Sequence, residues 1–339
     1  MNMRRKIKLS ILDQSIVRKG GTAKQAVEET IATAKLAERL GYSRFWVSEH
    51  HNSTMIAGSV PEVLMVKLAD ETNHIRIGSG GIMLPNHSAL KVAENFRMLE
   101  VLFPGRIDLG IGRAPGGDRI TAALLNPSNN FSEDSYLSQL DHLQAYFTDK
   151  AATKYGPLLA VPQAPTIPLR WILSSSGGSA LIAAKYGLGL VIAKFINGFA
   201  SSEMVERYRE NFQISEQFPE PQEMLSVSVL CAETEEKALQ LRKLSDYFLL
   251  QFERGIIQPI GSYEEIKDHQ FLMMERERIQ YNSGRIVSGN KEQVKDQLTK
   301  LADEFDVDEI MVTTMTYSYE DRIRSFELLA KVFELERRK

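Results

Sequence analysis

The sequence predicts one TIM (β/α)8 barrel domain over residues 1–339, with an insertion after the seventh strand. A short apolar stretch followed by an amphipathic helical stretch recurs eight times, and eight parallel strands are the number that closes such a barrel. Open parallel sheets usually stop at about five or six strands. The length of 339 residues exceeds that of a usual domain, but α/β barrels reach it as one unit.

The first four units precede a proline-rich segment. We expect strands at 6–12, 44–48, 75–80 and 107–111, followed in turn by helices at 22–40, 61–71, 88–102 and 132–147. Gly41 suits the left-handed residue after a helix, and Pro61 suits a first helical turn. The four prolines in 156–168 are incompatible with a helix or a central strand. This segment is therefore expected to be an extended connector between two halves.

The last four units follow the connector. We expect strands at 171–174, 189–193, 225–231 and 307–314, with helices at 179–186, 201–212, 233–248 and 319–335. Residues 248–285 are polar and have no clear period, so we expect an insertion over the strand ends. Such insertions often form lids, and the alternative is a surface excursion without a function.

The composition is that of an ordinary globular protein, with 43% hydrophobic and 25% charged residues. The net charge of −3 argues against a nucleic-acid or membrane-surface partner, because both usually require a basic surface. The single cysteine cannot form an intrachain disulfide, which fits a reducing cytoplasm. No apolar run approaches the roughly 18 residues of a membrane-spanning helix. We expect a soluble cytoplasmic protein.

Glu49, His50 and His51 directly follow the second expected strand, although the chain has only 6 histidines. In a βα architecture this end of the sheet carries ligand chemistry. Neighbouring strand residues point to opposite faces, so one of His50 and His51 should face the site and the other should brace it. The alternative is a histidine pair that only ties a loop down. The pair is adjacent rather than four residues apart, so we expect no metal site.

Two further strand ends suggest an anion site. Arg113 follows a glycine-rich strand end, and arginine is suited to planar contacts with phosphate or carboxylate. After the fifth strand comes a turn whose small residues expose backbone N–H groups at a helix start, where the helix dipole favours an anion. The residues of this turn are Ser175, Ser176, Gly177, Gly178 and Ser179. An ordinary serine N-cap is the alternative, but it needs only one serine.

Gly80 and Gly81 lie at the end of the third strand. Glycine weakens a strand unless something must approach its backbone closely, and a planar ring is one candidate.

Helices 61–71 and 88–102 are more apolar around their circumference than a helix with one solvated face, which predicts a homodimer built from these two helices.

Together these stretches resemble the bacterial luciferase-like flavin-dependent monooxygenases, over nearly the whole chain. The resemblance implies a TIM-like barrel, usually dimeric, that binds reduced FMN and oxygenates a small organic substrate through a C4a-hydroperoxide of the flavin. It places the FMN phosphate between Arg113 and the serine turn. The isoalloxazine ring would rest near Gly80-Gly81, where relatives carry a cis peptide bond. A flavin reductase would supply the reduced FMN.

His50 matches the luciferase histidine implicated in catalysis, and we expect His50 and His51 to be the catalytic pair, with Glu49 or His51 orienting His50. Luciferases have a cysteine immediately before the phosphate arginine, whereas this chain has Gly112, so we do not expect light emission. Three alternatives remain at this stage: hydride transfer with the deazaflavin F420, a flavin-binding protein without activity, and a metal-dependent barrel hydrolase.

Overall fold

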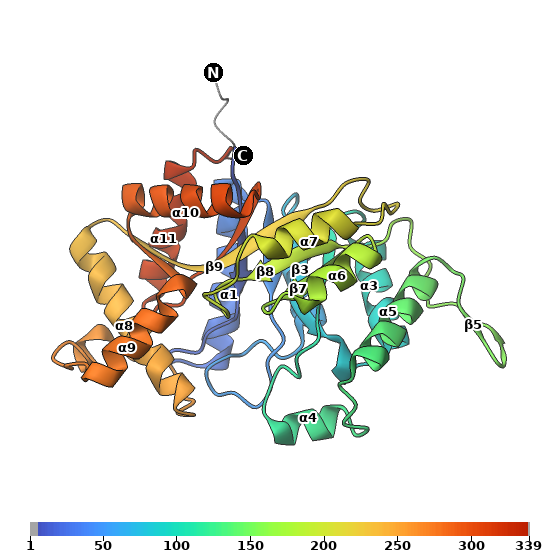
Figure 1. Cartoon of the computed structure of the whole chain (residues 1–339), viewed down its shortest axis with the longest axis horizontal. Helices are drawn as coiled ribbons and strands as arrows, with labels where there is room; N and C mark the ends of the chain where they lie inside the picture. Colours follow the sequence, from blue (N-terminus) through green and yellow to red (C-terminus); the bar gives the residue numbers. More distant parts are fainter. Residues whose placement is uncertain (1–5, 338–339) are drawn as a thin grey trace.

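Eight parallel strands close into a barrel in the computed structural model, which describes residues 6–337 (Figure 1). Each strand pairs with the next around the circle, and β11 returns to pair with β1. The barrel strands are β1 (Lys8–Asp13), β2 (Arg44–Val47), β3 (Arg76–Met83), β4 (Ile107–Gly112), β7 (Leu169–Ser174), β8 (Gly189–Ala193), β9 (Glu223–Ala232) and β11 (Glu309–Thr313). These strands confirm the predicted barrel and all eight predicted strand positions.

Strand β9 has different neighbours in its two halves. Its first half lies between β8 and β11 and belongs to the barrel. Its second half, from Ser228 to Ala232, pairs with β10 (Ile286–Asn290). The sheet therefore has nine strands, of which β10 lies outside the closed circle.

Helices follow the strands around the outside of the barrel (Figure 1). The eight that match the predicted helices are α1 (Ala23–Leu40), α2 (Pro61–Asp70), α3 (Ala89–Leu102), α5 (Glu133–Phe147), α6 (Gly178–Lys185), α7 (Glu203–Asn211), α8 (Glu235–Glu253) and α11 (Tyr319–Val332). Helix α1 begins with a capping box between Thr22 and Gln25, and it ends at Gly41 with φ of 88°. The main core lies between these helices and the outward faces of the strands.

Several elements were not predicted. They are α4 (Arg119–Leu125), α9 (Met273–Asn282), α10 (Lys291–Phe305), the short pair β5 (Ala152–Thr153) and β6 (Gly156–Pro157), and strand β10. Strand β10 has the sequence IVSGN, and its glycine and asparagine hide the strand pattern. Helix α9 has four charged residues among its ten and only two buried ones, so it lacks the apolar stripe on which the prediction relied. The rest of the connector contains a cis Val161–Pro162 bond.

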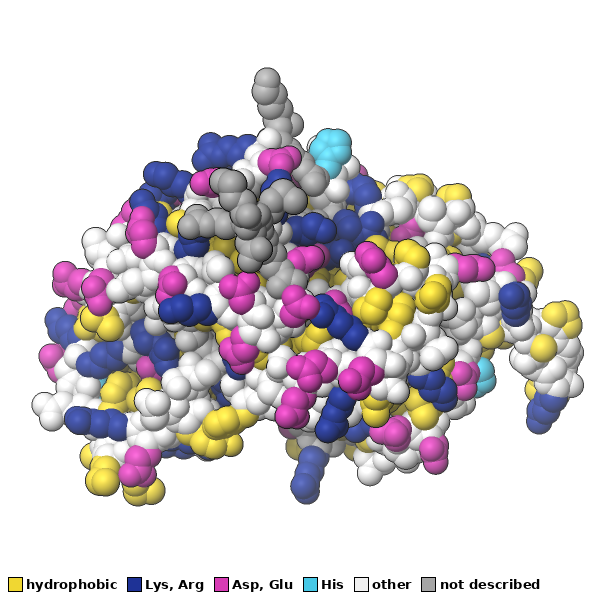
Figure 2. Space-filling view, turned by 45° about the horizontal axis from the view of Figure 1, so that its top comes forward, with side chains coloured by type: hydrophobic (Ala, Val, Ile, Leu, Met, Phe, Trp, Pro, Cys, Tyr) yellow, Lys and Arg dark blue, Asp and Glu magenta, His cyan; other side chains and the backbone are white. Residues whose placement is uncertain are grey.

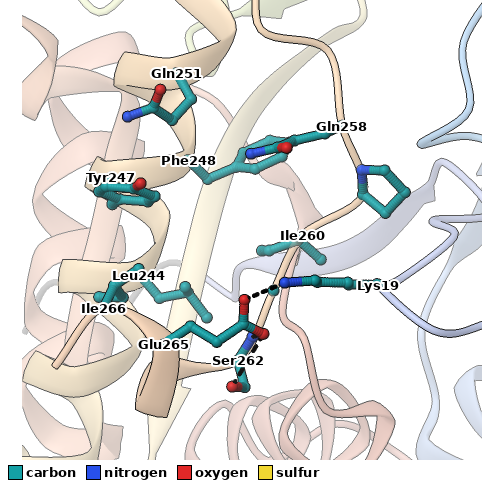
Figure 3. A pocket seen from close by; sticks show the side chains of 12 residues that line it. Lys19, Leu244, Tyr247, Phe248, Gln251, Gln258, Ile260, Ser262, Glu265 and Ile266 are labelled. Atoms are coloured by element: carbon teal, nitrogen blue, oxygen red, sulfur yellow. Dashed lines mark hydrogen bonds and ion pairs between the residues drawn. The ribbon is translucent and has the colours of Figure 1, made fainter.

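The insertion is attached to the loop after β1. The N–H of Lys19 donates to the carbonyl of Ile260 at 2.9 Å, and the Lys19 ammonium pairs with Glu265. Figure 3 shows the cavity of about 130 Å³ that these residues line together with Leu244 and Phe248 of α8. Helix α8 runs to Glu253, so the ordered helix extends into the segment that was predicted to have no period.

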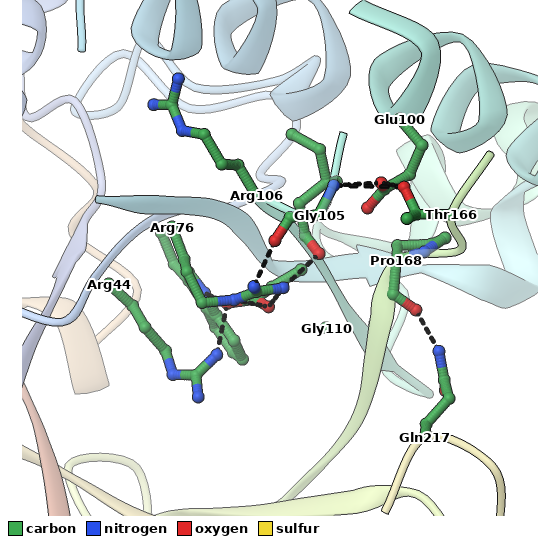
Figure 4. A network of polar contacts seen from close by, with 12 residues as sticks. Arg44, Arg76, Glu100, Gly105, Arg106, Gly110, Thr166, Pro168 and Gln217 are labelled. Carbon is green, nitrogen blue, oxygen red and sulfur yellow. Dashed lines mark hydrogen bonds and ion pairs between the residues drawn. The ribbon is translucent and has the colours of Figure 1, made fainter. Parts of the chain in front are cut away.

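A charged layer fills the N-terminal end of the barrel interior. Asp108 accepts hydrogen bonds from Arg44, Arg76 and the indole N–H of Trp46 at 2.8–2.9 Å. Figure 4 shows Arg44 and Arg76 side by side in this layer. Above it Trp46 and Trp171 meet edge to face, with ring centroids 6.1 Å apart. This end of the barrel is therefore closed, which leaves the opposite end, where the strands terminate, for ligand binding.

None of the helices among residues 6–337 is long and apolar enough to cross a membrane. On the face drawn in Figure 2, basic and acidic side chains are interspersed. Within the same described residues, no group of three His, Cys, Asp or Glu side chains is placed to hold a metal ion.

Candidate active site

The C-terminal end of the barrel interior carries small side chains. Side chains alternate along a strand, so Ser48 faces inward two residues beyond Trp46, and Ser226 faces inward two residues beyond Met224. The Ser226 hydroxyl is buried and has no hydrogen-bond partner among the described residues. Gly80 is only half-buried at this end, so its backbone is open to solvent. Within the described part of the chain, the barrel mouth therefore carries small side chains and one unpaired polar atom, the Ser226 hydroxyl, above the tryptophan layer.

Close packing restricts the glycines at the end of β3 to residues without a side chain. A Cβ at Gly78 would lie 2.4 Å from Nε1 of Trp46, so glycine is needed there because the indole packs on the backbone. The peptide between Gly80 and Gly81 is cis, as the resemblance implied. A Cβ at Gly81 would lie 2.8 Å from the carbonyl oxygen of Gly110, so close strand packing also restricts this position.

The two histidine side chains make contacts on opposite sides of the chain, as the alternation predicted. Nδ1 of His50 lies 3.0 Å from the hydroxyl of the inward-facing Ser48. Nε2 of His51 lies 2.9 Å from Oε1 of the fully buried Glu49. The expectation that Glu49 or His51 would orient His50 was therefore wrong in detail, because Ser48 makes that contact. Glu49 points to the other side of the strand, where it braces His51.

Burial lowers the pKa of His50, and this effect exceeds the opposing attraction of Glu49. Burial also opposes the charged form of His87, but the hydrogen bond and negative charge of Glu49 outweigh it and raise the pKa of His87. At pH 6.5, which is the ordinary pKa of histidine, His50 is therefore mostly neutral and His87 is mostly protonated. A neutral imidazole can accept a proton, which is the property expected of a catalytic base.

The predicted anion-site residues come from neighbouring strands. Ile111 of β4 pairs with Ile172 of β7, so the register places Arg113 beside the start of the serine turn. The Arg113 guanidinium is 42% exposed and donates to Glu133 at 2.8 Å. In the turn, Gly177 has φ of 88° and precedes α6, and its N–H donates to the hydroxyl of Ser174. The carbonyl of Ser175 accepts from Asn197 at 2.8 Å, which fixes the turn.

Ser176, Gly178 and Ser179 of the turn are at least partly exposed to solvent, so a ligand can reach them. Ser176 and Gly178 are exposed, Ser179 is half-buried, and a Cβ at Gly178 would meet nothing within 4 Å. The phenol of Tyr136 on α5 is buried without a hydrogen-bond partner among residues 6–337. Burial raises the pKa of Tyr136, whereas the positive charge of Arg113 acts in the opposite direction. A guanidinium, a helix start and an unpaired phenol are donors suited to a phosphate.

Sequence reasoning missed Glu49 as the centre of a network, and it missed His87 and Tyr136. His87 directly follows Leu84–Asn86, a short 3-10 helix after the third strand. Tyr136 occupies a helical position whose apolar neighbours suggest a core residue. Neither residue carries a local signal of function, because only the folded contacts distinguish them.

A family model described as luciferase-like monooxygenase matches residues 7–306. The chain is 47% identical over 330 residues to the uncharacterized protein YwcH of Bacillus subtilis, covering 96% of this chain and 99% of that protein. It is 36% identical over 333 residues to N-acetyl-S-alkylcysteine monooxygenase of the same organism, with coverage of 96% and 97%. It is 26% identical to the oxygenase component of flavin-dependent trigonelline monooxygenase of Acinetobacter baylyi, with 76% of each chain covered. The crystal structure of apo-MsnO8 superposes with a TM-score of 0.90 at 37% identity, covering 98% of this chain and 100% of that one.

Proposed function

The chain belongs to the luciferase-like monooxygenase family, and from this premise we propose that it binds reduced FMN at the C-terminal barrel mouth and uses it with O₂ to oxygenate a small organic substrate. The enzyme is an oxidoreductase of the monooxygenase class. The observation that carries the proposal is the convergence of three strand ends. Arg113 after β4, the serine turn after β7 and His50 after β2 all meet at one end of one barrel.

Each group at the mouth has a distinct task in this proposal. Arg113 and the backbone N–H groups of the serine turn hold the FMN phosphate, and Gly80-Gly81 leaves space for the flat ring. When bound, reduced FMN supplies the electrons with which O₂ is split between the substrate and water. Nε2 of His50 accepts or returns a proton at the substrate or oxygen, because Nδ1 faces Ser48. Once bound, the ring would cover the small side chains of the mouth and exclude bulk water from them.

The partners follow from the same proposal. The relative from Acinetobacter baylyi is named as an oxygenase component, so we expect this enzyme also to receive reduced FMN from a separate flavin reductase.

A homodimer through α2 and α3 is supported by the apolar side chains that these two helices expose. They are Val63, Val66, Met98, Val101 and Leu102, which are between 39% and 69% exposed. The localisation expected from the sequence remains cytoplasmic.

The direct test is a binding titration followed by turnover. Both tryptophans lie beneath the mouth, so FMN bound there should quench most of the intrinsic tryptophan fluorescence. The protein with reduced FMN and a panel of thioethers, amines and ketones should incorporate isotopically labelled O₂ into a product detected by mass spectrometry. Quenching by F420 but not by FMN, with hydride transfer to substrate in the absence of O₂, would instead favour the deazaflavin alternative.

A further inference from the structure

Glu49 is completely buried at the end of β2, yet each of its carboxylate oxygens has a donor. Oε1 accepts from Nε2 of His51 and from Nε2 of His87, each at 2.9 Å. Oε2 accepts from the backbone N–H of Met83 at 2.9 Å. A charged carboxylate is tolerated in a protein interior only when such partners replace its water. Burial opposes the ionised form, but these hydrogen bonds outweigh it and lower the pKa of Glu49, so the group is ionised near neutral pH.

The three contacts join chain segments that are far apart in sequence. Met83 ends β3, two residues after Gly81, and His87 lies just before α3. His51 in turn donates its backbone N–H to the carbonyl of Gly116 at 3.0 Å, which adds the loop after β4. One carboxylate thus connects the ends of β2 and β3 directly and the β4 loop through His51. These are the segments that carry His50, the Gly80-Gly81 peptide and Arg113.

We propose that Glu49 is a positioning residue, whose carboxylate holds the end of β3 and its Gly80-Gly81 peptide in place against the end of β2, so that the flavin ring is bound in register with His50. This inference rests on the proposed function. Glu49 itself makes no contact with the mouth, because its side chain points away from the interior face that carries Ser48 and His50. Its effect on ligand binding is transmitted through the Met83 N–H and the two imidazoles.

The electrostatic surroundings allow a matched control. The titratable groups facing Glu49 are His51 and His87, His50 is its neighbour in the chain, and Glu62 on α2 adds a second negative charge that acts on His87. Glu62 accepts only a long hydrogen bond from Asn95 at 3.4 Å among the described contacts. Glu62→Gln therefore removes a charge near the same histidine without breaking a link between strand ends.

The experiment compares wild type, Glu49→Gln and Glu62→Gln. Glutamine keeps the shape and one acceptor, so Glu49→Gln should fold, but it loses the ionised oxygens that bind three donors. We expect FMN affinity to fall about tenfold or more, as for the loss of a charge-assisted contact. The visible circular dichroism of bound FMN should change, and the NMR titration of His87 should move to lower pH. Glu62→Gln should bind FMN within about twofold of wild type, with unchanged dichroism, because no strand link is lost.

A folded Glu49→Gln protein with wild-type FMN affinity and dichroism would overturn the proposal. If Glu49→Gln does not fold, Glu49→Asp replaces it, since aspartate keeps the charge but is too short to reach all three donors. Wild-type FMN affinity in folded Glu49→Asp would also overturn the proposal. If wild type binds no FMN, the proposed function fails on its own, and an unchanged His87 titration in Glu49→Gln then refutes the role of Glu49 separately.

Discussion

The hydroxyl of Ser48 lies 3.0 Å from Nδ1 of His50. Both side chains follow β2 on the face that points into the barrel. Because Nδ1 is occupied in this way, Nε2 is the ring nitrogen that can meet a ligand at the mouth. Ser48 thus orients the ring and leaves Nε2 as the nitrogen available for proton exchange with a ligand.

Ser48→Ala should slow substrate oxygenation about fivefold, the effect of one neutral hydrogen bond of roughly 1 kcal/mol. FMN affinity should stay unchanged, since Ser48 holds only the imidazole. Steady-state rates and a fluorescence titration measure the two quantities. The exposed Ser59→Ala is the matched control, and a rate for Ser48→Ala equal to that of this control would show that the ring needs no such support.

The lowered pKa of His50 predicts activity that persists into mildly acidic solution. A step that requires the neutral imidazole loses rate only as pH falls through this lowered pKa, which lies below the ordinary value of 6.5. The ratio kcat/KM for the substrate, measured from about pH 5 to pH 8, should therefore decline below pH 6.5 rather than at it. A decline centred above 6.5 would contradict the assignment of His50 as the proton acceptor.

The sequence predicted the barrel because its strands and helices are strongly periodic, and it located the mouth because parallel strands end together. It failed where a residue acts through a contact distant in the chain. Glu49, for example, binds His87, which lies 38 positions later.

Weak patterns explain the omission of β10 and α9, but not that of α10, which has a regular apolar face and a capping box between Asn290 and Gln293. Strand β10 contains a glycine, and α9 is charged around most of its surface, so neither could be distinguished from a loop by periodicity. The cis peptide at Gly80-Gly81 was expected only through the family resemblance, since no local pattern in the residues specifies it.

Arg113→Ala should weaken FMN binding at least tenfold, because it removes a charge-assisted contact of about 1.5–3 kcal/mol. The observed ion pair with Glu133 provides a second test. Glu133→Gln frees the guanidinium from this competing carboxylate, so FMN should bind equally well or somewhat more tightly. Fluorescence titrations of both variants decide the matter. Equal affinity of Arg113→Ala and wild type would remove Arg113 from the phosphate site.

Val63→Glu should convert the proposed homodimer into a monomer at micromolar concentration. Val63 is 69% exposed on α2, and a carboxylate buried there in an apolar interface would be unpaired. Light scattering coupled to gel filtration measures the mass. Leu124→Glu on α4 is the control, since it changes an apolar residue of similar exposure, 76%, away from α2 and α3. A wild-type protein that is already monomeric would refute the dimer.

His50→Ala should leave FMN affinity within a few-fold of wild type while slowing oxygenation about 10²–10⁴-fold, the usual contribution of a general acid or base. The reason is position, since His50 follows β2 whereas the phosphate donors follow β4 and β7. His51→Ala provides the contrast, because it removes one of the three donors of Glu49 and should weaken FMN binding as well as turnover. Rapid mixing of the reduced complex with O₂ and substrate, with product quantified over time, separates binding from chemistry. If His50→Ala oxygenates substrate at the wild-type rate, His50 only ties down its loop, and the proton must be transferred by another group.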